Sequence, residues 1–334
     1  MALGFGLLSG QRAPGDTRSW SDVYQEMIDL TVHAEKVGFE SVWTTEHHFV
    51  DDGYMPSLLV TSAAMAQATS TITIGTGVVL APLYHPLRLA EDAATVALLS
   101  EGRLELGLGL GWSDIEFEAL GADITKRGRA MDEILQILPM AWTGEPFRWQ
   151  GDIYTFPEIG VRPTPDAAIP VIVGGTVDGA VRRAARFADG FFSNASSTRF
   201  LHQIQVAREE LARTDRDPDG FIWIYYAPIF PTDDPDEGLS HVWHQRWKYS
   251  DMEASASRSG AIVPTPALDE KTTAMMQKAA LIGSSQQIID HLNEVKEQAG
   301  VPIRFMARSH FSTLSFARQV ELMDLLAEEV LPHV

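Results

Sequence analysis

The sequence predicts an α/β protein whose eight strand–helix units close into a TIM (β/α)8 barrel. Short apolar segments alternate with amphipathic ones along the chain, which favours a parallel sheet with helices between its strands. Eight units suit closure of a barrel, and 334 residues suffice for one barrel with an insertion. An open doubly wound sheet in two domains is the alternative. No change of composition marks a boundary, so we expect residues 1–334 to form one domain.

Eight short apolar stretches are predicted to be the strands, because they are bounded by turn-forming residues and most are rich in β-branched or aromatic side chains. In chain order they are residues 3–8, 40–45, 72–80, 104–110, 170–173, 190–193, 221–230 and 303–310.

Amphipathic segments between these strands are predicted to be helices. In the first of them Val23, Met27, Leu30 and Ala34 recur at helical spacing, and Gly38 ends the pattern. The predicted helices are residues 19–36, 57–68, 86–99, 126–142, 178–187, 200–213, 285–298 and 315–330.

Two regions do not follow this alternation. Residues 143–170 are rich in proline and aromatic side chains, which indicates an ordered connection. Residues 232–273 are rich in Asp, Ser and Pro and are predicted to be an insertion late in the barrel, with one helix around 239–249. Long loops of this kind are often functional, so we expect the insertion to shape specificity.

Composition excludes several classes of protein. The chain has no cysteine, which excludes disulfides, thiolate metal sites and a cysteine nucleophile. Its net charge of −19 argues against binding to nucleic acid or to an anionic membrane. The sequence shows no signal peptide and no apolar run of about 18 residues, so we expect a cytoplasmic protein that does not enter the membrane.

The second predicted strand runs into the sequence Glu46-His47-His48-Phe49. Active sites of barrels lie at the carboxyl ends of their strands. Adjacent side chains of an extended chain point opposite ways, so only one histidine can face the barrel mouth. We predict a catalytic or cofactor-binding role for His47, with a structural histidine as the alternative. No metal site is expected, because adjacent residues seldom chelate one ion.

Glycines recur in the third and fourth strands. Gly75 and Gly77 lie in the third, and Gly107, Gly109 and Gly111 alternate in the fourth. Glycine inside a strand marks a close approach of the backbone to a ligand or to another strand. The pattern therefore suits either a stacked ring or a crowded barrel interior.

The fifth strand leads through Gly174-Gly175-Thr176 into a helix. Backbone N–H groups at such a turn, together with the helix N-terminus, can bind a phosphate. A plain tight turn capped by Thr176 or Asp178 is the alternative, and the negative charge of Asp178 is an objection to phosphate binding.

The last strand places Arg304, Arg308 and His310 on one face, where they either line the mouth and bind an anion or face the outer helices. Aromatic residues near the strand ends, Trp112 among them, suit an apolar pocket or the core. The sequence has no nucleophile elbow, P-loop or suggestive pair of carboxylates, so hydrolase and phosphotransferase functions have no starting point.

Taken in order and spacing, the motifs of this chain resemble those of the bacterial-luciferase-like flavin-dependent monooxygenases. The matching segments are residues 46–49 (Glu-His-His-Phe), 72–79 (Ile-Thr-Ile-Gly-Thr-Gly-Val-Val), 85–92 (His-Pro-Leu-Arg-Leu-Ala-Glu-Asp), 98–103 (Leu-Leu-Ser-Glu-Gly-Arg), 170–175 (Pro-Val-Ile-Val-Gly-Gly) and 281–284 (Leu-Ile-Gly-Ser). The resemblance covers nearly the whole chain and is weakest over residues 232–273.

This resemblance implies a TIM barrel that forms a homodimer and oxygenates a substrate with reduced FMN and O2. A separate flavin reductase would supply the FMN, since no nicotinamide fingerprint is present. His47 corresponds to the family's general acid/base. Residues 77–78 correspond to a non-prolyl cis peptide beside the flavin, and residues 174–176 to the phosphate loop. By position the predicted cofactor contacts are Glu46, Gly77, Val78, Trp112, Gly174, Gly175 and Thr176.

Two alternatives to this function stay open. The same family includes enzymes that transfer hydride with the 8-hydroxy-5-deazaflavin coenzyme F420, and the chain has Leu110 where luciferase carries a phosphate-binding arginine. A non-catalytic flavin-binding subunit is the other alternative, although the retention of His47 argues against it. The substrate is expected to be small and apolar, because aromatic residues lie near the strand ends.

Overall fold

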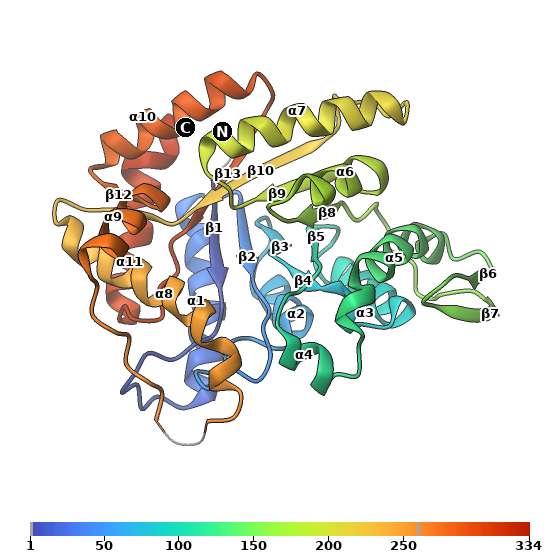
Figure 1. Ribbon diagram of the computed structural model, residues 1–334, viewed down its shortest axis with the longest axis horizontal. Helices are drawn as coiled ribbons and strands as arrows, with labels where there is room; N and C mark the ends of the chain where they lie inside the picture. Colours follow the sequence, from blue (N-terminus) through green and yellow to red (C-terminus); the bar gives the residue numbers. More distant parts are fainter. Residues whose placement is uncertain (1–2, 259–260) are drawn as a thin grey trace.

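The computed structural model describes residues 3–258 and 261–334, and these form a closed parallel β-barrel ringed by helices (Figure 1). The strand order is β3-β2-β1-β13-β10-β9-β8-β5-β4, and pairing of β3 with β5 closes the ring. The predicted barrel is confirmed, and the open doubly wound sheet is excluded. The barrel strands are β1 (Leu3–Leu8), β2 (Ser41–Thr44), β3 (Thr73–Thr76), β4 (Val79–Leu80), β5 (Leu104–Gly109), β8 (Val171–Gly174), β9 (Gly190–Ser193), β10 (Ile222–Ala227) and β13 (Arg304–Arg308).

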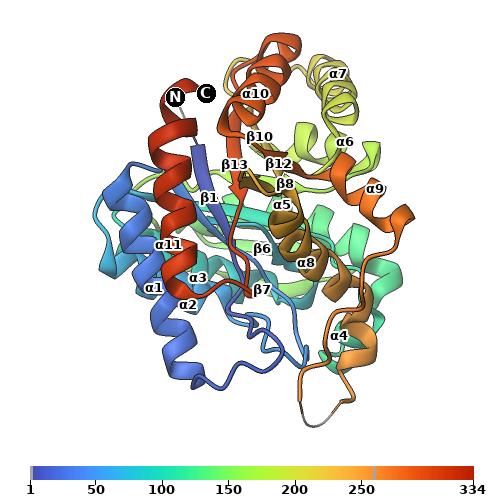
Figure 2. The same ribbon diagram turned by 90° about the vertical axis from the view of Figure 1, so that its left-hand side faces the viewer.

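Helices surround the barrel and bury their apolar faces against its strands (Figures 1 and 2). Helix α1 illustrates why they form where they do: Ser19 and Asp22 make a capping box at its start, and Gly38 ends it with φ of 95°. The helices are α1 (Trp20–Val37), α2 (Leu58–Ala68), α3 (Pro86–Leu99), α4 (Asp114–Ala119), α5 (Arg127–Trp142), α6 (Asp178–Phe187), α7 (Ser197–Arg213), α8 (Pro235–Ser255), α9 (Glu270–Ala279), α10 (Ser285–Ala299) and α11 (Phe316–Leu325). Short 3-10 or π segments occur at Ala81–Leu83, Ile124–Lys126, Leu326–Val330 and Leu331–His333.

The stretch predicted as one strand at 72–80 is divided. β3 ends at Thr76, the peptide bond between Gly77 and Val78 is cis, and β4 resumes at Val79. The irregular stretch 143–170 contains an antiparallel hairpin of β6 (Phe147–Gln150) and β7 (Thr155–Ile159), which the sequence analysis described only as an ordered connection.

The insertion predicted at 232–273 is more helical than expected. Helix α8 has 21 residues, and α9 was not predicted at all; residues 259–260 lie outside the described part. The base of the insertion is held by a two-stranded parallel sheet of β11 (Ile229–Pro231) and β12 (Leu281–Gly283). The described parts of the insertion are therefore attached at both ends to the barrel.

The interior of the barrel explains part of the glycine pattern. Trp43 is fully buried inside it and stacks on Phe192 with ring centroids 5.0 Å apart. A Cβ atom at Gly75 would lie 2.3 Å from the Trp43 ring, and one at Gly107 would lie 1.9 Å from the carbonyl oxygen of Thr76. These two glycines therefore serve the crowded barrel interior.

Candidate functional site

A cavity of about 560 Å³ opens at the carboxyl ends of the barrel strands. We call it the glycine-lined cavity, because Gly77, Gly109, Gly111, Gly174 and Gly175 line it. The structure brings every predicted site residue to this one cavity: Glu46, His47, Gly77, Val78, Trp112, Gly174, Gly175 and Thr176. Its volume lies within the range of small-molecule sites.

His47 lies on the wall of this cavity and is held by a carboxylate. Its Nδ1 is 3.0 Å from Oε1 of Glu116, a buried residue on the short helix α4. The same oxygen accepts a hydrogen bond of 2.8 Å from the backbone N–H of His48. Since a carboxylate only accepts, Nδ1 carries the proton in this pair, and Nε2 is left to exchange a proton with a ligand.

Aromatic side chains surround the His47 ring. Tyr54 and Tyr249 present their rings edge-on, with centroids 4.9 and 5.6 Å from that of the imidazole, and the Trp112 centroid is 5.9 Å away. Tyr249 belongs to α8, so the insertion helps to cover the catalytic candidate. Such packing limits the access of water to His47 and fixes its orientation.

The carboxylate of Glu46 contacts three protein groups. Oε2 accepts 2.7 Å from the backbone N–H of Leu80, and Oε1 accepts 2.6 Å from the Tyr84 hydroxyl. Oε1 also lies 3.0 Å from Nε2 of His48. Glu46 therefore ties β2 to β4 and engages the second histidine. Among residues 3–258 and 261–334, no group of three or more His, Asp or Glu is arranged to hold a metal ion.

Glycines form part of one wall of the cavity, so this wall carries few side chains. A Cβ at Gly109 would lie 2.4 Å from Cγ2 of Val78, and one at Gly174 would lie 2.8 Å from Cγ1 of the same residue. The Val78 side chain fills the space that larger residues at either position would need. A planar ring system can approach this wall closely, so the residues present fit a flavin-type ring.

The predicted phosphate loop lies at the N-terminus of α6. In the described part of the chain, the backbone N–H groups of Thr176 and Val177 donate to no protein acceptor. The carboxylate of Asp178 is turned to α7, where Arg199 Nη2 lies 2.5 Å and His202 Nε2 3.4 Å away. The hydrogen bond from His202 and the charge of Arg199 lower the pKa of Asp178. The anticipated repulsion is thus offset, and the loop fits a phosphate.

The face predicted to carry Arg304, Arg308 and His310 is divided among three environments. Arg304 forms an ion pair with Glu105 of β5, which lies on the opposite side of the barrel from β13. Arg308 lines the glycine-lined cavity, and its Nη2 donates to the Tyr249 hydroxyl at 2.9 Å. That hydroxyl lies 3.1 Å from the hydroxyl of Tyr54. Arg308 therefore joins the last strand to α8 and to the residues around His47.

His310 is only 3% exposed, and burial lowers its pKa to about 4. In the unfolded chain a histidine titrates near 6.5, so the unfolded state binds a proton between these values and the folded state does not. The neutral His310 side chain therefore makes its full contribution to the free energy of unfolding above about pH 6.5. This contribution, about 3 kcal/mol, is lost as the pH falls towards 4.

The wild-type protein is expected to lose unfolding free energy when the pH falls from 7.5 to 4.5. In His310→Gln this loss should be smaller by about 2–3 kcal/mol. Denaturant titrations at the two pH values measure this, and His333→Gln at an exposed C-terminal position is the matched control. The same pH dependence in wild type and in His310→Gln would contradict the assignment.

A buried ion-pair network holds α8 against the loop that follows His48. Lys248 is 1% exposed, and its Nζ lies 2.6 Å from Asp51, 3.3 Å from Asp251 and 3.5 Å from Asp52. Arg258 also pairs with Asp51 and Asp251, at 3.2 and 2.6 Å. Burial acts to lower the pKa of Lys248, but the surrounding carboxylates outweigh it and the net shift is upward.

Lys248→Met is expected to destabilise the fold by about 3–5 kcal/mol, because it leaves buried carboxylates without their central cation. Denaturant unfolding measures the loss. Lys271→Met, at an exposed position of α9, is the control and is expected to change stability by less than about 0.5 kcal/mol. Equal effects of the two substitutions would show that the network does not hold α8.

Three residues of the site were not predicted from the sequence. Glu116 lies 69 residues from its partner His47, and neither Tyr249 nor Arg246 stood out within the insertion. Ser113 before two acidic residues is a helix-start signal and could have located α4. No signal in the sequence indicates which acid contacts the histidine.

The chain is similar in sequence to known proteins. A family model described as luciferase-like monooxygenase matches residues 1–302. The oxygenase component of a flavin-dependent trigonelline monooxygenase from Acinetobacter baylyi is 31% identical over 163 residues, which are 48% of this chain and 45% of that protein. An F420-dependent glucose-6-phosphate dehydrogenase from Amycolatopsis mediterranei is 26% identical over 213 residues, which are 60% of this chain and 64% of that protein. Each match thus spans less than two thirds of the relative.

A solved structure, that of a monooxygenase from Streptomyces bottropensis, superposes with a TM-score of 0.84 over 100% of this chain and 99% of the other. The two sequences are 20% identical, so this likeness concerns the fold. In the described part of the chain, no helix is long and apolar enough to cross a membrane.

Proposed function

Because the chain belongs to the luciferase-like monooxygenase family, we propose that it binds reduced FMN in the glycine-lined cavity and uses O2 to oxygenate a small organic substrate. The observation that supports this proposal most strongly is the buried pair of His47 and Glu116, in which Nδ1 lies 3.0 Å from Oε1. His47 lies on the wall of the same cavity as the glycines and the phosphate loop. A histidine oriented by a carboxylate at a cofactor-sized cavity supplies general acid/base catalysis.

Each part of the cavity has a role in this proposal. The bound FMN would supply the electrons that activate O2. Gly77, Val78 and Gly109 form the wall for its ring, and the N–H groups of Thr176 and Val177 bind its phosphate. His47 moves the proton that the reaction requires through Nε2, while Glu116 holds Nδ1. Trp112 and the aromatic cluster exclude water from the reacting end.

A second candidate function is hydride transfer with the deazaflavin coenzyme F420 on the same fold. The relative from Amycolatopsis mediterranei, which depends on F420, favours it. The relative from Acinetobacter baylyi, an oxygenase component, and the Glu46-His47-His48 sequence support FMN. Both candidates use the same cavity and the same histidine.

We also propose that a separate reductase delivers the reduced flavin, since the relative from Acinetobacter baylyi is one component of its enzyme and this sequence has no nicotinamide fingerprint. A homodimer of one-domain chains remains our expectation for the assembly.

The reaction with O2 tests the proposed function. Protein loaded anaerobically with reduced FMN is mixed with O2 in a stopped-flow instrument, and flavin reoxidation is followed together with H2O2 release. We expect reoxidation of bound flavin in two resolved phases, slower than that of free reduced FMN, because the cavity shields the ring. Reoxidation identical to that of free FMN would argue against an oxygenase.

A further inference from the structure

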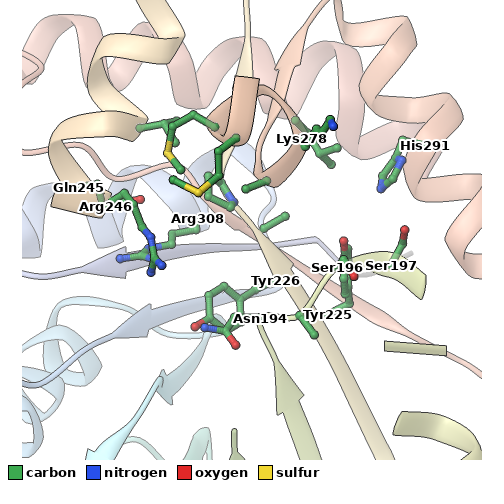
Figure 3. A pocket seen from close by; sticks show the side chains of 18 of the residues that line it. Asn194, Ser196, Ser197, Tyr225, Tyr226, Gln245, Arg246, Lys278, His291 and Arg308 are labelled. Carbon is green, nitrogen blue, oxygen red and sulfur yellow. The ribbon is translucent and has the colours of Figure 1, made fainter. Parts of the chain in front are cut away.

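A second cavity, of about 520 Å³ (Figure 3), adjoins the glycine-lined cavity. The two share Thr176, Asn194, Tyr226, Arg246 and Arg308 in their walls, so they are neighbouring compartments of one barrel mouth. We call the second one the basic cavity, after the cationic or hydroxyl-bearing residues Ser196, Ser197, Arg246, Lys278, His291 and Arg308 that line it.

The charge of the basic cavity is opposite to that of the chain. The sequence has 45 acidic and 26 basic residues, yet no Asp or Glu among the described residues lines this cavity. Within residues 3–258 and 261–334, the side chains of Arg246, Lys278 and His291 make no ion pair or hydrogen bond with the protein. In Figure 3 Arg246 of α8 lies beside Arg308 on one side of the cavity, whereas Lys278 of α9 and His291 of α10 lie on the other side. Arg246 and Lys278 are therefore cations at the walls of this cavity without a counter-charge among the described residues, and such charges attract an anion.

Arg308 provides an independent indication of a ligand. It lies between the two cavities. Its Nη2 donates to the Tyr249 hydroxyl, whereas its Nε is buried and has no acceptor among the described residues. Buried donors without a protein partner are uncommon and need an explanation. The N-terminus of α7, a helix of 17 residues that begins after Ser196, also lines the basic cavity and favours negative charge there.

We propose that the basic cavity holds the carboxylate or phosphate group of the substrate, while the part to be oxidised lies in the glycine-lined cavity near His47. The substrate is then a small organic anion with an apolar body, and side chains such as Val242, Met275 and Met276 contact that body. The identity of the reaction rests on the proposed function, but the anion site does not depend on it.

A cofactor phosphate is the other source of an anion in this mouth. The loop of residues 174–176 already offers backbone N–H groups for such a phosphate in the glycine-lined cavity. The basic cavity is thus an additional anion site, which favours the substrate as its occupant.

Calorimetric titration of protein saturated with FMN tests this inference. The probes are benzoate and phenyl phosphate, with benzyl alcohol as the uncharged match. The variants are Arg246→Met and Lys278→Met, both at exposed side chains, with Lys278→Arg as the conservative variant and Lys271→Met as the control on the same helix. Flavin affinity is measured separately for each protein.

We expect both anions to bind and benzyl alcohol to bind at least tenfold more weakly. Arg246→Met and Lys278→Met should each weaken anion binding by about tenfold, whereas Lys278→Arg and Lys271→Met should leave it unchanged. FMN affinity should be the same in wild type and in the three Lys variants, none of which changes a residue that lines the glycine-lined cavity. This pattern would support the inference.

The inference would be overturned if Arg246→Met and Lys278→Met left anion binding unaffected. It would also be overturned if benzyl alcohol bound as tightly as the anions. Reduced affinity of Lys278→Met for FMN or for the deazaflavin, together with anions that bind only in the absence of cofactor, would assign the cavity to the cofactor and also overturn the inference. If the protein bound no flavin, the same titration without cofactor would still test the cavity, so failure of the proposed function would be recognised separately.

Discussion

His47→Ala is expected to lower the yield of oxygenated product per turnover by a factor of about 10²–10⁴. The imidazole is the titratable group at the cavity wall that a buried carboxylate orients, with Glu116 Oε1 3.0 Å from its Nδ1. Alanine removes the proton carrier but leaves the glycine wall and the phosphate loop. The measurement is incorporation of ¹⁸O from ¹⁸O2 into product in single turnovers with limiting reduced FMN.

The binding of reduced FMN should change by less than threefold in His47→Ala, which separates chemistry from cofactor affinity. His333→Ala, at an exposed position of the C-terminal turn, is the control and should retain full labelling. Unchanged labelling in His47→Ala would remove His47 from the mechanism.

Glu116→Gln is expected to lower the catalytic rate by about 10–100-fold through His47, which makes Glu116 a positioning residue. One oxygen of Glu116 contacts both Nδ1 of His47 and the backbone N–H of His48. The amide keeps the size of the side chain but removes the charge that stabilises a protonated imidazole. It can also present its NH2 group to Nδ1 and so favour the wrong tautomer.

Three readouts distinguish this role from a structural one. In Glu116→Gln the rate constant kcat should fall while the KM for substrate and the Kd for flavin stay within about threefold. The pH dependence of kcat should change shape, since the charge beside the imidazole is gone. Glu118→Gln, on the exposed side of α4, should behave as wild type. A loss of flavin binding equal to the loss of kcat would contradict the positioning role.

Most of the barrel could be predicted because its strands and helices have clear periodicities. The structure matches the predicted 3–8, 86–99, 178–187 and 190–193 to the residue. The predicted strand 72–80 is divided at Gly77, where the peptide bond is cis. The continuous apolar run gives no sign of this break, although the family resemblance implies a cis peptide at residues 77–78. Helix α9 was missed because its sequence is polar, although Asp269 caps it by accepting a hydrogen bond of 2.7 Å from the Thr272 N–H.

The candidate site was predictable to the extent that it is local in sequence. His47 and residues 174–176 follow barrel strands directly, and strand ends converge at one mouth whatever their separation along the chain. Glu116, Tyr249 and the basic cavity depend instead on how α4, α8 and α9 pack over that mouth. Contacts of this kind arise from tertiary packing, and a single sequence does not specify them.

The two predicted reasons for the strand glycines both apply, at different positions. Gly75 and Gly107 make room for Trp43 and for the backbone of β3 inside the barrel. Gly77 and Gly109 line the cavity. The alternation in sequence could not separate these roles, because the barrel interior and the cavity floor lie on the same face of the strands.

The central claim, that this family member uses FMN and O2, is tested most directly by an anaerobic titration of the cofactor-free protein. Reduced FMN and the deazaflavin coenzyme F420 are titrated in parallel, and binding is followed by flavin absorbance and fluorescence. The account predicts that reduced FMN binds at least tenfold more tightly than the deazaflavin and fills one site per chain. Tight binding of the deazaflavin with none of reduced FMN would contradict it and would make the protein a hydride-transfer enzyme on the same barrel.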